Sequence, residues 1–458
     1  MASHFVTSAD IPADGERLQN ATASKIKTVS GGLCALLSLV SAVLLFFAPE
    51  SVKAPFAYSW LFAFFFFFTL AIGGIFWTLL HNVSNSGWGT AVRRVMENLG
   101  SVFPWICLFA IPLLCPAVQK YLYEWMNTHR EAAAIDGIST FEANPKSLFG
   151  FYGSEAMKAW FYENHHALLK YKAWYMNLFA WYTRMIFYFV SMTLVIRGLR
   201  KLSVAQDTDP NPGTKRLFQA RFHSTYTFIL FAITITFAAF DLLMGLDFKW
   251  FSTMWGVYLF AGSALNSMAV IIITVALLHQ AGYMKRVVSP EHFHIKGKLL
   301  LAFTIFWAYI AFSQFFLIWY ANITEETSYF LIRNTGGWNT ANIFLVFGHF
   351  VVPFVILLQA WLKRNPKMLS LMAVYMLVMH VVDLYIIVIP ERSVSLMNML
   401  PETFGHVTTA IPGAFWGDLL AFVTIGSGFV FFFLRALGSN NLYPNRDPRI
   451  LESANVSN

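Results

Sequence analysis

The run FAYSWLFAFFFFFTLAIGGIFWTLL, residues 56–80, decides the fold, because it carries no charged side chain over a length that can cross a membrane. A helix rises about 1.5 Å per residue, so roughly twenty apolar residues cross the roughly 30 Å hydrocarbon layer while bonding their own backbone groups. Similar runs recur outward from it, near residues 28–48, 101–121, 173–198, 219–243, 255–280, 299–321, 341–362, 369–390 and 415–435. The sequence therefore predicts an all-α polytopic membrane protein with ten transmembrane helices.

The composition agrees with lipid as the main solvent of the chain. Of 458 residues, 57% are hydrophobic and only 12% are charged, against about a quarter charged in soluble domains. The net charge of +8 comes from basic residues beside the spans, which argues against nucleic-acid binding. Cys34, Cys107 and Cys115 form no C-x-x-C pattern, so neither an iron–sulfur cluster nor covalent haem is predicted. Nothing indicates a nucleotide loop, a catalytic triad or a metal site.

The distribution of Lys and Arg predicts the orientation of the chain. The side that holds both termini receives 21 of these residues and the opposite side ten, six of them in the long loop 122–172. Short loops decide orientation, so the tails 1–25 and 436–458 are expected in the cytoplasm. The N-terminal tail is polar and unlike a cleaved signal, so the first span is expected to be retained. The long loop is expected to be amphipathic, lying on the membrane or a partner, or packed on its own bundle.

Matching polar residues indicate an internal repeat. His81 ends the second predicted helix and His279 ends the sixth, at an offset of 198 residues. Asp241 in the fifth helix and Asp383 in the ninth both precede leucine, at an offset of 142. Two parallel four-helix bundles, residues 56–243 and 255–390, are therefore expected between the first helix, 26–48, and the tenth, 415–435. Repeats of this kind occur in transport proteins.

Ionisable side chains inside the spans are the main functional candidates, since one at mid-membrane costs roughly 2.5–3.5 kcal/mol. Five lie there: Arg184, Asp241, His349, His380 and Asp383. His380 and Asp383, three residues apart, share a helix face, and an imidazole beside a carboxylate passes protons near neutral pH. The pair is interpreted as a proton relay or ligand site with His349 nearby. Arg184 and Asp241 are interpreted as a proton-path pair or as an ion pair that fixes packing.

Three further candidates lie nearer the ends of helices. His81 and His279 are expected either to meet water and the helix dipole or to form the cytoplasmic mouth of a proton path. Asp418 is expected to cap the N-terminus of the tenth helix, with an exit group as the second interpretation. The aromatic run Phe64 to Phe68 covers every face of its helix, so lipid contact is expected there.

Three segments resemble a known family: Gly73 to Asn82 (GGIFWTLLHN), Phe240 to Asp247 (FDLLMGLD) and Trp250 to Tyr258 (WFSTMWGVY). Over essentially the whole chain they resemble the NrfD/polysulfide-reductase-C-like membrane subunits, most closely the ActF type of bacterial alternative complex III. The resemblance implies ten helices in two bundles, no redox cofactor on this chain and a place in the bacterial inner membrane. It implies as partners a homologous quinol-binding ActC-like subunit, an iron–sulfur subunit, multihaem cytochromes and a terminal oxidase. The assembled complex oxidises quinol and reduces cytochrome c or an oxidase.

One departure from that family bears on the site. Quinol-binding members use polar and acidic groups in the first bundle, but here the third helix, Ser101 to Tyr121, contains no histidine and no acid. A quinol site on this chain is therefore in doubt, which favours a scaffold or proton-conducting subunit. Two alternatives stay open. His349 and His380 could ligate one haem in a cytochrome b-like carrier, or the chain could be a secondary transporter, which the lack of matching broken helices disfavours.

Overall fold

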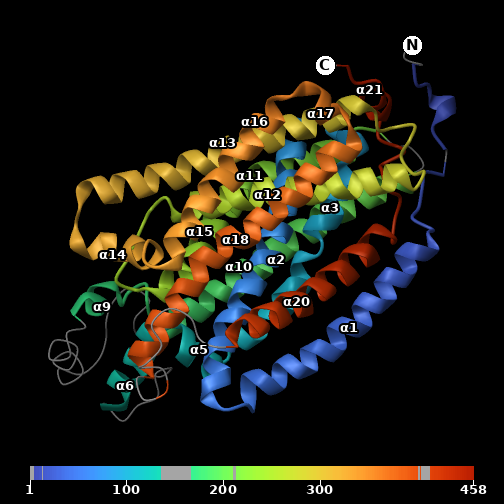
Figure 1. The fold of residues 1–458 in the computed structure, drawn as a ribbon. Helices are drawn as coiled ribbons and strands as arrows, with labels where there is room; N and C mark the ends of the chain where they lie inside the picture. Colours follow the sequence, from blue (N-terminus) through green and yellow to red (C-terminus); the bar gives the residue numbers. More distant parts are fainter. Residues whose placement is uncertain are drawn as a thin grey trace.

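The computed structural model describes residues 5–12, 14–135, 167–209, 213–400, 403 and 413–457 of the chain. These residues form helices and connections and contain no strand. Ten helical segments among them are long and apolar enough to cross a membrane, as predicted. Figure 1 shows them as a slanted bundle with the two chain ends at the same end of the molecule. The protein is a polytopic integral membrane protein.

Eight spans are single helices: α1 Ala21–Phe46, α2 Glu50–Ser84, α10 Leu178–Asp207, α11 Lys215–Leu242, α12 Trp255–Gln280, α13 Pro290–Ala321, α18 Pro366–Met399 and α20 Ala414–Leu437. The third span is divided into α3 Arg93–Gly100, α4 Phe103–Ile106 and η3 Cys107–Leu114. The eighth is divided into α15 Gly337–Leu345, η5 Val346–Val351 and α16 Val352–Leu358. Shorter helices are η1 Ser8–Asp10, η2 Trp88–Ala91, α5 Pro116–Leu122, α6 Glu124–Ile135, α9 Ala167–Lys172, η4 Met244–Leu246, α14 Thr324–Arg333, α17 Ala360–Arg364 and α21 Ile450–Ala454.

Prolines account for the two divided spans. Pro112 lies inside the 3-10 segment of the third span, where its missing N–H and its ring disfavour a regular α-helix. In the eighth span the helix widens into a π-helix just before Pro353. The ring of a helical proline clashes with the carbonyl four residues earlier, which here belongs to His349. The π-turn therefore brings His349 out of regular register, and such turns often occur at functional sites.

Helix α2 is the centre of the molecule. In the most apolar 18-residue stretch of α2, 94% of the residues are buried, whereas 17% are buried in that of α1. Helix α2 packs against α3, α11, α12, α18 and α20, so both predicted bundles meet on it. Phe64 to Phe68 are all buried, and the expectation of lipid contact for this run is wrong. A helix that is hydrophobic on every face can be either lipid-facing or a core helix, and neighbours on every side decide for the core.

Glycines allow α2 and α12 to approach closely. A Cβ atom on Gly73 would lie 2.3 Å from the backbone oxygen of Ser263 in α12. On the neighbouring side, a Cβ atom on Gly74 would lie 2.5 Å from the backbone nitrogen of Gly100 in α3. Backbone therefore faces backbone at both positions, and no side chain larger than hydrogen fits there.

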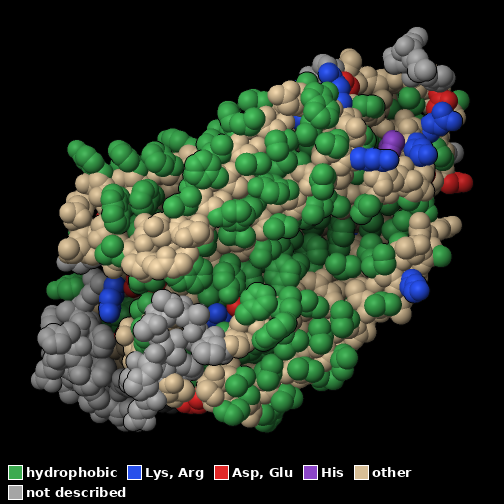
Figure 2. Space-filling view, in the orientation of Figure 1, with side chains coloured by type: hydrophobic (Ala, Val, Ile, Leu, Met, Phe, Trp, Pro, Cys, Tyr) green, Lys and Arg blue, Asp and Glu red, His purple; other side chains and the backbone are tan. Residues whose placement is uncertain are grey.

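Both termini lie on one side of the membrane, which follows from the even number of spans. The tails bind each other there: Val6 and Asn455 exchange two hydrogen bonds of 2.8 Å, and the Leu442 amide donates to the Glu16 carbonyl at 2.7 Å. We call this the tail side, and the opposite face the far side. Figure 2 shows a broad hydrophobic surface between the two ends of the molecule, with Lys and Arg gathered at the tail side. Of the long loop 122–172, which the sequence predicts to be amphipathic, residues 136–166 lie outside the described residues.

Candidate functional site

The structure places the eight candidate residues in three buried clusters and at two separate positions. Arg184 and Asp241 form one cluster in the first predicted bundle. His380 and Asp383, with His349 next to them, form a second in the other bundle. Asp418 lies in a third cluster, while His81 and His279 lie apart near the tail side.

In the first cluster, Arg184 neutralises Asp241. Its Nε and Nη2 atoms each donate to one carboxylate oxygen at 2.8 Å, and the Tyr188 hydroxyl donates to the same carboxylate at 2.9 Å. The guanidinium lies 3.8 Å from the centre of the Tyr175 ring and donates to the Tyr175 carbonyl at 2.8 Å. Such a two-pronged pair is geometrically specific and strong. The arrangement fits the interpretation of an ion pair that fixes packing.

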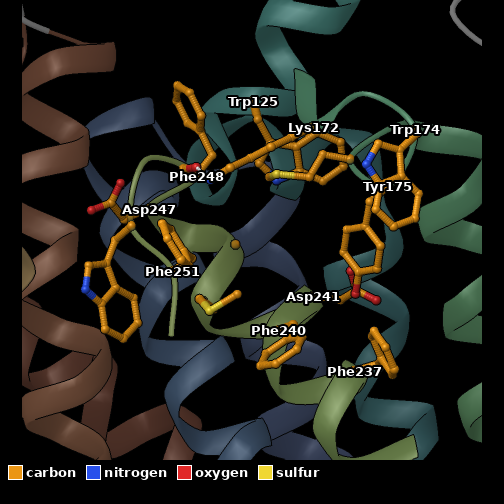
Figure 3. A pocket seen from close by; sticks show the side chains of 14 residues that line it. Trp125, Lys172, Trp174, Tyr175, Phe237, Phe240, Asp241, Asp247, Phe248 and Phe251 are labelled. Carbon is orange, nitrogen blue, oxygen red and sulfur yellow. Dashed lines mark hydrogen bonds between the residues drawn. The ribbon is translucent and has the colours of Figure 1, made fainter. Parts of the chain in front are cut away.

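A cavity of about 300 Å³ borders this pair on the far side. Figure 3 shows Asp241 and Tyr175 on one wall and Trp125, Phe248 and Lys172 on others. The Lys172 ammonium donates to the Phe248 carbonyl at 2.6 Å, and burial lowers the pKa of this lysine. Three donors already bind the carboxylate of Asp241, two of them on Arg184. The carboxylate beside the cavity therefore has its charge balanced by Arg184.

The second cluster holds a carboxylate without a cationic side chain. Asp383 accepts hydrogen bonds from the Tyr258 hydroxyl and, at 3.2 Å, from the Trp307 indole. His380 lies one turn away, with 3.7 Å between its Nδ1 atom and Asp383 Oδ2, and its Nε2 atom lies 2.9 Å from the Thr69 hydroxyl. Among the described residues, no Lys or Arg forms an ion pair with Asp383. Since Asp383 is 2% exposed, its charge must be balanced by a proton or by His380.

His349 adds a third titratable group to this cluster. It is fully buried in the π-turn, and its ring centre lies 4.0 Å from that of Trp307. Trp307 therefore contacts His349 with its ring and Asp383 with its N–H. Within the described part of the chain, neither nitrogen of His349 has a hydrogen-bond partner. A buried polar group without a partner is costly, which is typical of a site with a purpose other than packing.

A cavity of about 990 Å³ opens beside Asp383. Asp383, Tyr258 and Trp307 form its inner wall, and aromatic side chains of α13 and α14 form much of the rest. Amides line it toward the far side: Gln314, Asn334, Asn339 and Asn342. Several of its wall residues are exposed on the outer surface of the helices, among them Tyr309, Phe312, Ile343 and Val346. Asp383 is thus buried but borders a cavity that reaches the outer surface of the helices.

The third cluster corrects the interpretation of Asp418. Its carboxylate does not cap α20, whose N-terminal residue Gly413 has no side-chain cap. It instead binds Arg392 at 2.7 Å and accepts from the hydroxyls of Ser59 and Tyr385 at 2.6 and 2.9 Å. One turn into the helix, the side chain faces the protein core rather than the free amides, and a buried arginine is the stronger partner. Asp418 of α20 therefore forms an ion pair with Arg392 of α18.

The sequence reasoning missed several members of these clusters. Arg392 belongs to the third cluster, and Glu391 lies 3.5 Å from Arg333, whose guanidinium also binds the carbonyls of Ile386 and Ile387. The adjacent charges at 391 and 392, at the end of an apolar run, were a usable signal. Thr69, Tyr258 and Trp307 carried none, because hydroxyl and indole groups are common in membrane helices.

His81 lies in the last turn of α2, at the tail side. Its ring is buried, and neither nitrogen has a partner among the described residues. Thr78 of α2 and Ser267 and Asn266 of α12 are also buried, and Thr69 lies beside His380. The Asn266 side-chain oxygen also lacks a partner within the described residues. Thr78, Asn266 and Ser267 each donate to a carbonyl of their own helix, so in the described structure their donated hydrogen bonds do not connect His81 to His380. His279 lies in the last turn of α12, with its ring 6.1 Å from that of Phe293.

Comparison with models of known protein families found no match to this chain, and comparison with curated proteins found no relative. The class of polytopic integral membrane protein therefore rests on the ten spans and their packing.

Proposed function

We propose that this chain is an integral subunit, without its own redox cofactor, of a bacterial quinol:cytochrome c oxidoreductase of the alternative complex III type, where it packs against partner subunits and conducts protons. The observation that carries the proton role is the environment of Asp383. This buried carboxylate has no cationic side-chain partner among the described residues, lies beside a histidine and borders a large cavity. The respiratory setting is supported by the resemblance of residues 73–82 and 240–258 to that family.

The contrast between the two bundles supports the choice of Asp383 over Asp241. A carboxylate bound by an arginine through two hydrogen bonds stays ionised, so it holds packing but exchanges protons poorly. Within the described residues, the hydrogen-bond donors to Asp383 are neutral and the carboxylate faces a histidine, so no arginine holds it in the ionised form. Histidine titrates near neutral pH, and a carboxylate and an imidazole in contact can exchange one proton.

The path that we propose begins at the tail side, which the excess of basic residues puts in the cytoplasm. A proton enters near His81 and passes the buried polar groups of α2 and α12, among them Thr78, Ser267 and Asn266, to Thr69 and His380. From His380 it passes to Asp383 and then to the cavity, whose amides lead toward the far side. Arg184 and Asp241, like Asp418 with Arg392, hold the helices in place around this path.

The partners that we propose follow from the resemblance. They are an ActC-like quinol-binding membrane subunit, an iron–sulfur subunit, multihaem cytochromes and a terminal oxidase. The exposed apolar side chains of α1, α11 and α13 leave lipid-facing surface on which another membrane subunit can pack.

The deciding experiment is Asp383→Asn in the assembled complex, reconstituted into vesicles. The variant is expected to assemble with the same subunits but to release fewer protons per electron transferred. Asp241→Asn is the matched control: it removes the corresponding carboxylate of the first bundle and is expected to weaken assembly instead. Unchanged proton release in Asp383→Asn would remove the proton role and leave a scaffold.

A second candidate function is quinol binding in the cavity of the second bundle. The cavity is walled by aromatic rings, opens between lipid-facing side chains and has a phenol and a carboxylate at its inner end. A ring with hydroxyl groups could stack there and bond to Asp383. Binding of a photoreactive quinone to the purified chain would test it, with labelled peptides expected from α13 and α15. Labelling only near Asp241 would contradict it.

The other two alternatives are less well supported by the geometry. A haem between His349 and His380 needs a ring nitrogen of each histidine at the iron. In His380, Nε2 faces Thr69 and Nδ1 faces Asp383, so a haem iron bound to either nitrogen would displace the contact that this nitrogen makes. For a transporter, the divided spans would have to match between repeats. Here they are the third and eighth spans, which occupy different positions in the two predicted bundles.

A further inference from the structure

The Thr69 hydroxyl has only one proton, and its position is determined by the geometry. Its oxygen lies 2.6 Å from the Phe66 carbonyl oxygen, one turn earlier in α2. Two oxygens at that separation repel each other unless a hydrogen lies between them, so the hydroxyl donates to Phe66. The same oxygen lies 2.9 Å from Nε2 of His380. Since the hydroxyl proton is already used, Thr69 can only accept this second hydrogen bond.

We infer that Thr69 is a positioning residue that holds the proton of His380 on Nε2, so that Nδ1 of His380 and Asp383 share one further proton. If His380 were neutral, Nδ1 would present a lone pair to Asp383 Oδ2 at 3.7 Å. A lone pair and an ionised carboxylate repel each other in a buried site. The repulsion is removed when one proton is added, either to Nδ1 or to the carboxylate.

The two arrangements of this proton have the same total charge. In one, Asp383 is a carboxylic acid and His380 is a neutral imidazole. Breaking the O–H bond of Asp383 and forming an N–H bond at Nδ1 gives a carboxylate and an imidazolium. The gap of 3.7 Å exceeds a direct hydrogen bond, and gaps of this length are closed by a small side-chain rotation or a bridging water. As a step in proton conduction, this inference rests on the proposed function.

The groups that surround the pair leave this proton as its main source of charge balance. From α12 the Tyr258 hydroxyl and from α13 the Trp307 indole bind Asp383. His349 in η5 lies against Trp307, and Tyr329 of α14 contributes another phenol to the cavity wall. Phe66 of α2 packs against the His380 ring, with 5.4 Å between ring centres. Arg333, the cation in the same cavity, is already bound by Glu391 and backbone carbonyls.

The test is nitrogen-15 magnetic resonance of the full chain in lipid with labelled histidine, the His380 signals being assigned by their loss in His380→Gln. Wild type is expected to show a protonated Nε2 on His380. Over the pH range in which His380 and Asp383 hold their shared proton, the His380 ring is expected to be either an imidazolium or neutral. In the neutral case a protonated carboxylic acid is expected in the infrared spectrum, and it should disappear in Asp383→Asn. Thr69→Val removes the acceptor and is expected to move the proton to Nδ1, while Thr69→Ser keeps the wild-type pattern.

The outcomes separate this inference from the proposed function. A neutral His380 with its proton on Nδ1 in wild type, or the same pattern in Thr69→Val and wild type, would overturn the inference. If Asp383→Asn then still lowered proton release in vesicles, the proposed function would stand without it. If the nitrogen pattern is as expected but Thr69→Val and Asp383→Asn release protons like wild type, the shared proton is real and the conduction role fails.

Discussion

Arg184 binds both carboxylate oxygens of Asp241 at 2.8 Å, whereas the corresponding carboxylate of the second predicted bundle, Asp383, is bound by a phenol and an indole. The two predicted bundles thus differ in the side chains that bind a buried acid. In one the acid is balanced by a permanent cation, and in the other its hydrogen-bond donors within the described residues are neutral.

Replacing Arg184 should be strongly destabilising. Arg184→Met leaves Asp241 buried at 4% exposure without its cation, and breaking a buried pair from one side costs about 3–5 kcal/mol. The free energy of unfolding, measured with denaturant in detergent, is expected to fall by that order. The double variant Arg184→Met with Asp241→Leu removes both charges and should recover much of the loss. If the double variant were no more stable than Arg184→Met, the pair would not be the cause.

Replacing Asp383 should have a much smaller effect on stability. Asp383→Asn keeps one acceptor oxygen and leaves no arginine unpaired, so the cost should be near that of one neutral hydrogen bond, about 0.5–1.5 kcal/mol. Asp418→Asn is the comparison, because it weakens the contact with Arg392 at 2.7 Å and should cost clearly more. Equal losses of unfolding free energy in the two variants would mean that Asp383 also has a permanent cationic partner.

A single methyl group at the centre of the molecule should separate α2 from α12. Gly73→Ala puts a Cβ atom 2.3 Å from the Ser263 carbonyl oxygen, and overpacking of this kind costs about 1–3 kcal/mol. Gly32→Ala in α1 is the matched control, since no atom lies within 4 Å of its Cβ position. There the loss of glycine flexibility should stabilise the helix by about 0.5–1 kcal/mol. Thermal unfolding in detergent should therefore shift in opposite directions for the two variants.

The ten spans could be predicted because lipid imposes a local rule: each helix must be about twenty apolar residues long. The burial of Phe64 to Phe68 could not, since a core helix and a lipid-facing helix have the same composition. The difference depends on how many neighbours surround α2, which is a property of the whole fold. The division of the eighth span at Pro353 is visible in the sequence only as a proline, and the packing of His349 against Trp307 in the π-turn is a property of the fold.

The candidate site shows the same division between local and non-local information. Asp383 and His380 could be found because charged side chains are rare in spans and their spacing of three fixes a common face. The contacts that distinguish Asp383 from Asp241 come from other helices: Thr69, Tyr258 and Trp307 lie far away in the sequence. For Asp418, the position near a helix start predicted a cap, and the partner that replaced the cap, Arg392, is supplied by the fold.

Acid should release the C-terminal tail from the tail side. Arg93 binds Asp447 at 2.8 Å and Arg449 binds it at 3.1 Å. Burial alone would raise the pKa of Asp447, but Arg93 and Arg449 together lower it below its ordinary value of 3.8. A carboxylate whose pKa is lower in the folded state than in the unfolded state stabilises the fold when it is ionised. This contribution is complete above about pH 3.8 and is lost as the pH falls through the folded pKa.

Hydrogen exchange of residues 441–457, corrected for the intrinsic rate, should therefore rise only below about pH 3.8 in wild type. Asp447→Asn should exchange faster than wild type above about pH 3.8 and show no such acid step, and an identical acid step in both proteins would contradict the role of Asp447.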